Sequence, residues 1–140
     1  MNIGPMTKKN VEVSSTQLAK LASEAWTVRE QAYILGNTKV GCALLTEDGR
    51  TYLGCNVEHR FRCHDVHAEV NAITSMVSAG ARKILALVVA AERARFTPCG
   101  SCMDWIMQFG SEDTIIAFQP RPNGPLEQYT AGQLMPFYPS

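Results

Sequence analysis

Apolar residues recur at helical spacing near the start of the chain. From Ser14 or Ser15, either of which suits a helix N-cap, the run TQLAKLASEAWTVREQAYIL places an apolar side chain every three or four residues. Gly36 follows the run and is typical of the position just after a helix. The pattern therefore predicts one amphipathic helix that reaches Leu35. Residues 1–13 are polar and aperiodic, and we expect them to form a loose arm.

Two short segments after this helix have the composition of paired strands. VGCALLT at residues 40–46 and TYLGCNV at residues 51–57 flank the turn sequence EDGR, so they predict a β-hairpin. Helical spacing returns in HAEVNAITSMVSAG, residues 67–80, and in CGSCMDWIMQFG, residues 99–110. Each of these segments ends at a glycine, and we expect two further helices.

The remaining apolar segments predict further strands of a sheet. KILALVVAA, residues 83–91, is rich in β-branched residues and nearly all apolar, which predicts a strand buried on both faces. TIIAFQ, residues 114–119, predicts another short strand, and TAGQLMPF, residues 130–137, predicts a last helical turn. This order of helices and strands implies a three-layer α/β/α sandwich around a mixed sheet.

Composition narrows the class of protein. The chain has 140 residues, the size of a single domain, and we expect residues 1–140 to form one domain. Lys and Arg together number 13, as do Asp and Glu, and this balance argues against a nucleic-acid partner. No apolar run approaches the roughly 20 residues that span a bilayer, so we expect no membrane partner.

The N-terminal sequence and the cysteines together indicate a compartment. MNIGPMTKKN lacks the apolar core of a signal peptide. The cysteines number five, and an odd count does not predict a disulfide framework. They favour a reduced compartment, in which some thiols are free and others bind metal. We therefore expect a cytoplasmic protein.

The segment PCGSC is the first candidate for a functional site. Cys99 and Cys102 stand three residues apart at the start of a predicted helix, just after Pro98, which places both sulfur atoms on one face. The positive end of the helix dipole favours thiolates there. On this motif alone, a redox pair, half of a structural zinc site and a chance spacing all remain open.

The segment HAE adds a third candidate ligand. His67 together with Cys99 and Cys102 would give a metal three protein ligands and one open position, the pattern of catalytic zinc sites. His64 is a rival ligand, because His64 and His67 are themselves at a metal-like spacing. Glu69 could overlook the open position as general acid and base if the helix start is irregular. The combination of H-x-E with P-C-x-x-C is the signature of zinc-dependent deaminases.

The chain resembles the cytidine deaminase family over residues 36–138. The resemblance rests on VGCALLTEDGRTYLGCNVE, on the spacing from NVE to HAE and on to PCGSC, and on the closing QLMPF. It implies a cytidine deaminase-like fold with a five-stranded sheet, a bound Zn²⁺ ion and hydrolytic deamination. The implied zinc ligands are His67, Cys99 and Cys102, the implied proton-transfer residue is Glu69, and the implied substrate contacts are Asn56, Glu58, Ala68 and Phe137.

The resemblance also implies what each of these residues does. Asn56 and Glu58 would hydrogen-bond the ribose, and the N–H of Ala68 would meet the base carbonyl. Glu69 would take a proton from water and pass protons to the ring nitrogen and to the departing amine. Short-chain relatives resemble one another in forming homotetramers, so we expect a homotetramer with Phe137 near a neighbour's site, a homodimer being the alternative.

Several positions around the substrate depart from the short-chain pattern. They are Thr38, His59, His67, Val70, Met103 and Asp104, where such relatives have Phe, Asn, Cys, Arg, Arg and Gln. The loop RFRCHDV, residues 60–66, also replaces a small segment that contains glycine, and we include Arg60 and Phe61 among the substrate contacts. These changes bear on the identity of the substrate more than on the chemistry.

The sequence therefore predicts a zinc-dependent hydrolytic deaminase of a small cytosine-containing nucleoside, cytidine or deoxycytidine. The alternative within enzymes is a deaminase of an aminonucleoside antibiotic such as blasticidin S, or of another aminated heterocycle. A polynucleotide-editing deaminase, a catalytically silent zinc protein and a redox CxxC protein are further alternatives. The arginines Arg60, Arg62, Arg93 and Arg95 are interpreted as solvated loop charges, with contact to an anionic or extended part of the substrate as the functional alternative.

Overall fold

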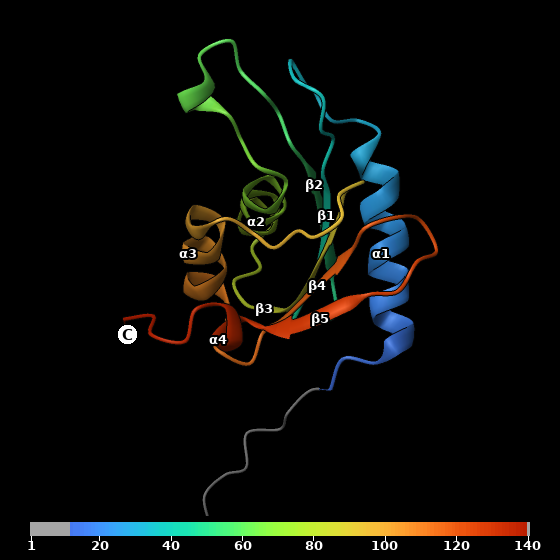
Figure 1. Cartoon of the computed structure of the whole chain (residues 1–140). Helices are drawn as coiled ribbons and strands as arrows, with labels where there is room; N and C mark the ends of the chain where they lie inside the picture. Colours follow the sequence, from blue (N-terminus) through green and yellow to red (C-terminus); the bar gives the residue numbers. More distant parts are fainter. Residues whose placement is uncertain (1–11, 140) are drawn as a thin grey trace, which may run out of the picture.

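The computed structural model describes residues 12–139, which form three layers (Figure 1). Helix α1 (Ser15–Arg29) covers one face of a five-stranded sheet, and α2 (Ala68–Ser78) and α3 (Gly100–Phe109) cover the other face. The predicted α/β/α sandwich around a mixed five-stranded sheet is confirmed. The arm expected at residues 1–13 falls almost entirely outside the described residues. Within the described part of the chain, no helix combines the length and the apolar character needed to cross a membrane.

The sheet has the strand order β2-β1-β3-β4-β5. Its strands are β1 (Gly41–Thr46), β2 (Thr51–Cys55), β3 (Ile84–Ala90), β4 (Ile115–Gln119) and β5 (Glu127–Thr130). β1 pairs antiparallel with β2 and β3, β3 pairs parallel with β4, and β4 pairs antiparallel with β5. The predicted hairpin is the β1–β2 pair, and nearly all of β3 is buried, as its composition predicts.

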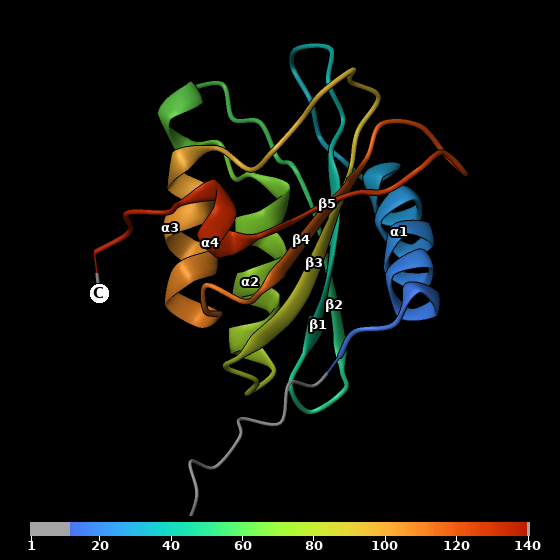
Figure 2. The ribbon, with the colours of Figure 1, turned by 60° about the horizontal axis from the view of Figure 1, so that its bottom comes forward.

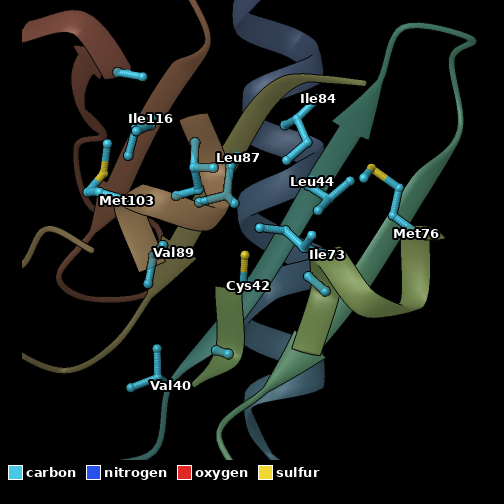
Figure 3. Close-up of a cluster of buried hydrophobic side chains, with 14 of the residues drawn as sticks. Val40, Cys42, Leu44, Ile73, Met76, Ile84, Leu87, Val89, Met103 and Ile116 are labelled. Atoms are coloured by element: carbon cyan, nitrogen blue, oxygen red, sulfur yellow. The ribbon is translucent and has the colours of Figure 1, made fainter. Parts of the chain in front are cut away.

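Alternate residues of the central strands face the two helical layers. Cys42 and Leu44 of β1 point toward Ile73 of α2 in one buried cluster (Figure 3). Ala43 and Leu45 belong to a second cluster, which packs against α1. Because side chains alternate along a strand, a single segment of chain supplies both halves of the core.

Helix α1 ends earlier than its apolar pattern predicts. The last helical residue is Arg29, and the prediction that the helix reaches Leu35 is wrong. The chain leaves the helix because Tyr33 pairs with the segment that follows β2. The N–H of Tyr33 donates to the Asn56 carbonyl at 3.1 Å, and the N–H of Glu58 donates to the Tyr33 carbonyl at 2.7 Å. Tertiary pairing therefore outweighs local helical spacing here.

The end of the chain contains one element that the hydrophobic pattern does not reveal. Strand β5 has the polar sequence EQYT, and it forms by pairing with the exposed edge of β4. The short helix α4 (Ala131–Leu134) follows at once, with Thr130 and Gln133 forming a reciprocal capping box. The predicted last helical turn is confirmed over these four residues.

Candidate metal centre and active site

Three potential metal ligands meet where α2 and α3 begin. His67 is the N-cap of α2 and Cys99 is the N-cap of α3, and both have extended backbone conformations. Nδ1 of His67 lies 3.3 Å from Sγ of Cys102 and 3.4 Å from Sγ of Cys99. The three ligand atoms lie within 4.8 Å of one another. His64, the rival ligand, lies in a 3₁₀ turn (Arg62–His64) and is not part of this group.

This arrangement fits a zinc ion. With Zn–N about 2.0 Å and Zn–S about 2.3 Å, a tetrahedral site separates nitrogen from sulfur by about 3.5 Å, close to the two distances found here. Burial raises the pKa of the Cys102 thiol, and Glu69 and Cys99 raise it further. A cation between the two thiols would offset this accumulation of negative charge. Two thiols and one imidazole are also the donors that zinc prefers, with one position left for a substrate or water.

Glu69 lies beside these ligands and is almost completely buried, with 2% of its surface exposed. His67 lies just outside the helix, so the rotation of about 100° per residue along a helix does not force the two side chains apart. Burial is the main cause that raises the pKa of the Glu69 carboxyl. Its own backbone N–H, His67 and the Cys102 thiol lower that pKa in part. A buried carboxyl with a raised pKa is suited to proton transfer near neutral pH.

A cavity of about 670 Å³ opens above the ligand group. Three connecting segments line it, and Figure 2 shows them at the same end of the sheet. They are residues 36–40 before β1, residues 56–66 after β2 and residues 93–99 after β3. This volume is typical of a site for a small molecule.

One glycine allows α2 to approach the sheet closely enough to bring its first residues to the cavity. A β-carbon at Gly54 of β2 would overlap the backbone nitrogen of Ala72 in α2. The approach is held by Asn71, whose Oδ1 accepts a hydrogen bond from the N–H of Cys55 at 2.9 Å. Strand β2 thereby sets the position of the helix that carries Glu69.

Asn56 and Glu58 line the cavity, and both already hold the segment before β1. The side chain of Asn56 accepts from the N–H of Val40 at 2.8 Å and donates to the Thr38 carbonyl at 3.0 Å. One carboxylate oxygen of Glu58 accepts from the N–H groups of Leu35 and Gly36, at 2.7 and 2.8 Å. These two backbone bonds are the main cause that lowers the pKa of Glu58.

The other predicted substrate contacts differ in position. Ala68 is the first residue of α2 and lines the cavity, so its N–H belongs to the helix end that has no intrahelical acceptor. Arg60, Phe61 and Phe137 do not line the cavity of the single chain. Phe61 is 62% exposed and Phe137 is 95% exposed. The structure therefore brings together the predicted ligands, Glu69, Asn56, Glu58 and Ala68, and leaves these three side chains outside.

Sequence reasoning gave too little weight to a second group of cavity residues, namely Arg62, Arg93, Arg95 and Phe96. Nε of Arg62 donates to Asp65 at 2.9 Å, and Nη2 lies 3.1 Å from Oε2 of Glu58. The guanidinium of Arg93 lies over the ring of Phe96, 5.4 Å from its centre. The only signal in the sequence was the closeness of these residues to NVE and to PCGSC.

Comparisons with known proteins match this geometry. The family model for the cytidine and deoxycytidylate deaminase zinc-binding region matches residues 15–118. A cytidine deaminase from Sporosarcina psychrophila is 36% identical over 119 residues, which cover 84% of this chain and 87% of that protein. A cytidine deaminase from Halalkalibacterium halodurans is 31% identical over 118 residues, covering 83% and 89%.

Solved structures have the same fold. The crystal structure of cytidine deaminase from Burkholderia pseudomallei matches with a TM-score of 0.79 at 30% identity, covering 89% of this chain and 98% of that one. That of cytidine deaminase from Mycobacterium leprae matches with a TM-score of 0.76 at 26% identity, covering 89% and 99%.

Proposed function

Since this chain belongs to the cytidine and deoxycytidylate deaminase family, we propose that it is an aminohydrolase that converts cytidine or deoxycytidine to the uracil nucleoside. It is a zinc-dependent deaminase, and His67, Cys99 and Cys102 are the residues proposed to hold the ion. The observation that carries the proposal is the convergence of these three ligand atoms beside buried Glu69 in one cavity. When bound, zinc supplies Lewis-acid chemistry that acidifies a water molecule.

Glu69 is proposed to move the protons of the reaction. Its carboxylate takes a proton from the attacking water and gives it to the ring nitrogen next to the amine-bearing carbon. A second proton passes through the same carboxyl to the amine, which leaves as ammonia while oxygen takes its place on the ring. Burial raises the pKa of Glu69, which favours the uptake of a proton from water by its carboxylate.

The walls of the cavity are proposed to orient the nucleoside. The N–H of Ala68, at the start of α2, is placed to donate to the carbonyl of the base. Asn56 and Glu58 are proposed to hydrogen-bond the ribose through donor and acceptor sites that their contacts within the chain leave free. An ionised carboxylate has about four acceptor sites, and Glu58 uses three of them on Leu35, Gly36 and Arg62.

We also propose that the chain acts as a single domain in a cytoplasmic homotetramer. Tyr33, Val57 and Val66 are exposed and adjoin one another through β-bridges, and a contiguous exposed apolar patch supports an assembly. Further exposed apolar side chains are Leu35, Phe61 and Phe137. Arg60, Phe61 and Phe137, which stand outside the cavity of one chain, would then reach the site of a neighbouring copy.

An ammonia-release screen tests the proposed reaction. The panel comprises cytidine, deoxycytidine, their monophosphates, cytosine, adenosine, guanine and blasticidin S, each with zinc-loaded protein. We expect ammonia from cytosine nucleosides, together with loss of the cytosine absorbance. Ammonia from adenosine, guanine or blasticidin S alone would contradict the proposal.

A further inference from the structure

We propose that Arg93 and Arg95 form an anion-binding subsite of the cavity, and that the preferred substrate is a cytosine nucleoside with an anionic group on its sugar. The group is a phosphate monoester or a carboxylate, since both have the oxygen pairs that a guanidinium fork binds. The inference rests on the proposed deaminase function, because it names the substrate class of that same site.

The arginines that line the cavity differ in whether a carboxylate pairs with them. Arg62 is neutralised by two carboxylates, with Asp65 at 2.9 Å and Glu58 at 3.1 Å. Arg93 and Arg95 line the same cavity, yet within residues 12–139 neither has a carboxylate at ion-pair distance. The cavity lining has three acidic residues and three arginines, and the two arginines without a carboxylate partner both lie in the segment after β3.

Packing fixes one of the two cations in place. The guanidinium of Arg93 lies over the ring of Phe96, 5.4 Å from its centre. Phe96 in turn packs against buried Phe118 of β4, with their ring centres 6.0 Å apart. The backbone N–H of Arg93 also donates to the Ala91 carbonyl at the end of β3, at 3.0 Å. The contact with Phe96 therefore favours one position of the Arg93 guanidinium before a ligand arrives, which reduces the entropy cost of binding.

The position of the subsite indicates which part of the substrate it meets. The amine-bearing ring must reach Glu69 and the ligand group, where α2 and α3 begin. Arg93 and Arg95 line the same cavity, precede Cys99 by several residues and are exposed to solvent. The sugar and its substituent are the parts of a nucleoside left to face them.

Equilibrium binding of reaction products tests the subsite without turnover. Uridine, uridine 5′-monophosphate and a uridine 5′-carboxylate are titrated by calorimetry into the zinc-loaded protein. We expect at least one anionic product to bind about tenfold or more tightly than uridine, as charged hydrogen bonds typically allow. The advantage should shrink in high salt. Whichever of the two anionic products binds more tightly identifies the anionic group, phosphate or carboxylate, that the subsite prefers.

Two variants distinguish a specific subsite from general attraction. The double variant Arg93→Gln/Arg95→Gln should bind uridine as the wild type does and lose the advantage of the anionic products. Arg121→Gln removes another exposed arginine that does not line the cavity, and the advantage should persist. Equal affinity for uridine and both anionic products, or an advantage that survives the double substitution, would overturn the inference.

The two proposals fail in different ways. Ammonia release from cytidine without any advantage for anionic products would overturn the subsite and leave the deaminase function intact. Absence of ammonia from every cytosine compound would overturn the function, whereas product binding still reports on the arginines.

Discussion

His67, as a proposed zinc ligand, would supply a neutral donor beside two thiolates, and this would set the charge of the metal site. Three thiolates on Zn²⁺ would give a formal charge of −1, whereas one imidazole and two thiolates give zero. Relatives with the three-thiolate pattern have arginines where this chain has Val70 and Met103. Here Met103 is 2% exposed and packs in the core (Figure 3), so a cation at that position would be buried at high cost. We interpret the residues at positions 67, 70 and 103 as one correlated change.

A pair of variants tests this charge balance. His67→Cys should still bind zinc but turn over more slowly, with the pH–rate limb shifted to alkaline pH, because a more negative site acidifies water less. Adding Val70→Arg should return part of the rate and move the limb back. The pH dependence of kcat/KM is the measurement. No alkaline shift in the single variant, or no recovery in the double variant, would refute the interpretation.

Glu58 links the stability of the cavity wall to pH. Hydrogen bonds from Gly36 and Leu35, with help from Arg62, hold the pKa of Glu58 below its ordinary value. A carboxyl whose pKa is lowered on folding stabilises the fold above its unfolded pKa, and this contribution is lost as pH falls through the folded pKa.

Substitution of Glu58 should therefore change the pH dependence of unfolding. Glu58→Gln should lower the Tm at neutral pH and reduce the further drop in Tm between neutral pH and pH of about 3.5, because the titrating group is gone. Glu112→Gln, at an exposed position, is the control. A variant that loses as much Tm on acidification as the wild type would show that Glu58 does not supply this linkage.

The sequence predicted the place of some site residues and not of others. The convergence of His67, Cys99, Cys102 and Glu69 was predictable because H-x-E and P-C-x-x-C have the spacing typical of zinc-dependent deaminases. Arg93 and Phe96 carry no such spacing. Their place in the cavity depends on the path of the segment between β3 and α3, which is a tertiary property.

At the level of elements, the proposed metal ligands lie at the starts of two helices. Cys102 lies in the first turn of α3 and is buried, while His67 caps α2. Removing one ligand should therefore weaken both metal binding and the contact between the helices.

Cys102→Ala should lose its zinc and unfold with about 2 kcal/mol or more of lost stability, lowering Tm by several degrees. Adding a chelator should lower the Tm of the wild type and leave that of the variant unchanged. Cys63→Ala, which removes an exposed thiol, should behave as the wild type does. Metal analysis that finds one zinc per chain in Cys102→Ala would contradict the ligand assignment.

The predicted elements failed where pairing between distant segments decides the structure. Residues 30–35 keep helical spacing, yet Tyr33 pairs with Val57 and Glu58 binds the following amides. Strand β5 has no apolar alternation and exists because β4 offers it an edge. The other helices and strands were predictable because each buries an apolar face that its own sequence encodes.

For the whole molecule, the exposed apolar side chains support the proposed homotetramer. Light scattering should give four times the 15.4 kDa mass of the chain at micromolar concentration. Phe137→Asp should shift the mass toward smaller species and lower activity while zinc content is kept, because Phe137 is exposed and does not line the cavity of the single chain. A wild-type monomer with full activity would contradict the tetramer.

The central claim is that three residues hold zinc while buried Glu69 transfers the protons. The most direct measurement is zinc content together with ammonia release from cytidine in the wild type and in Glu69→Gln. Gln has nearly the same shape but cannot accept and return a proton. The variant should therefore hold one zinc per chain and release ammonia at no more than about one hundredth of the wild-type rate. Turnover within about threefold of the wild type, at equal zinc content, would contradict the proton-transfer role.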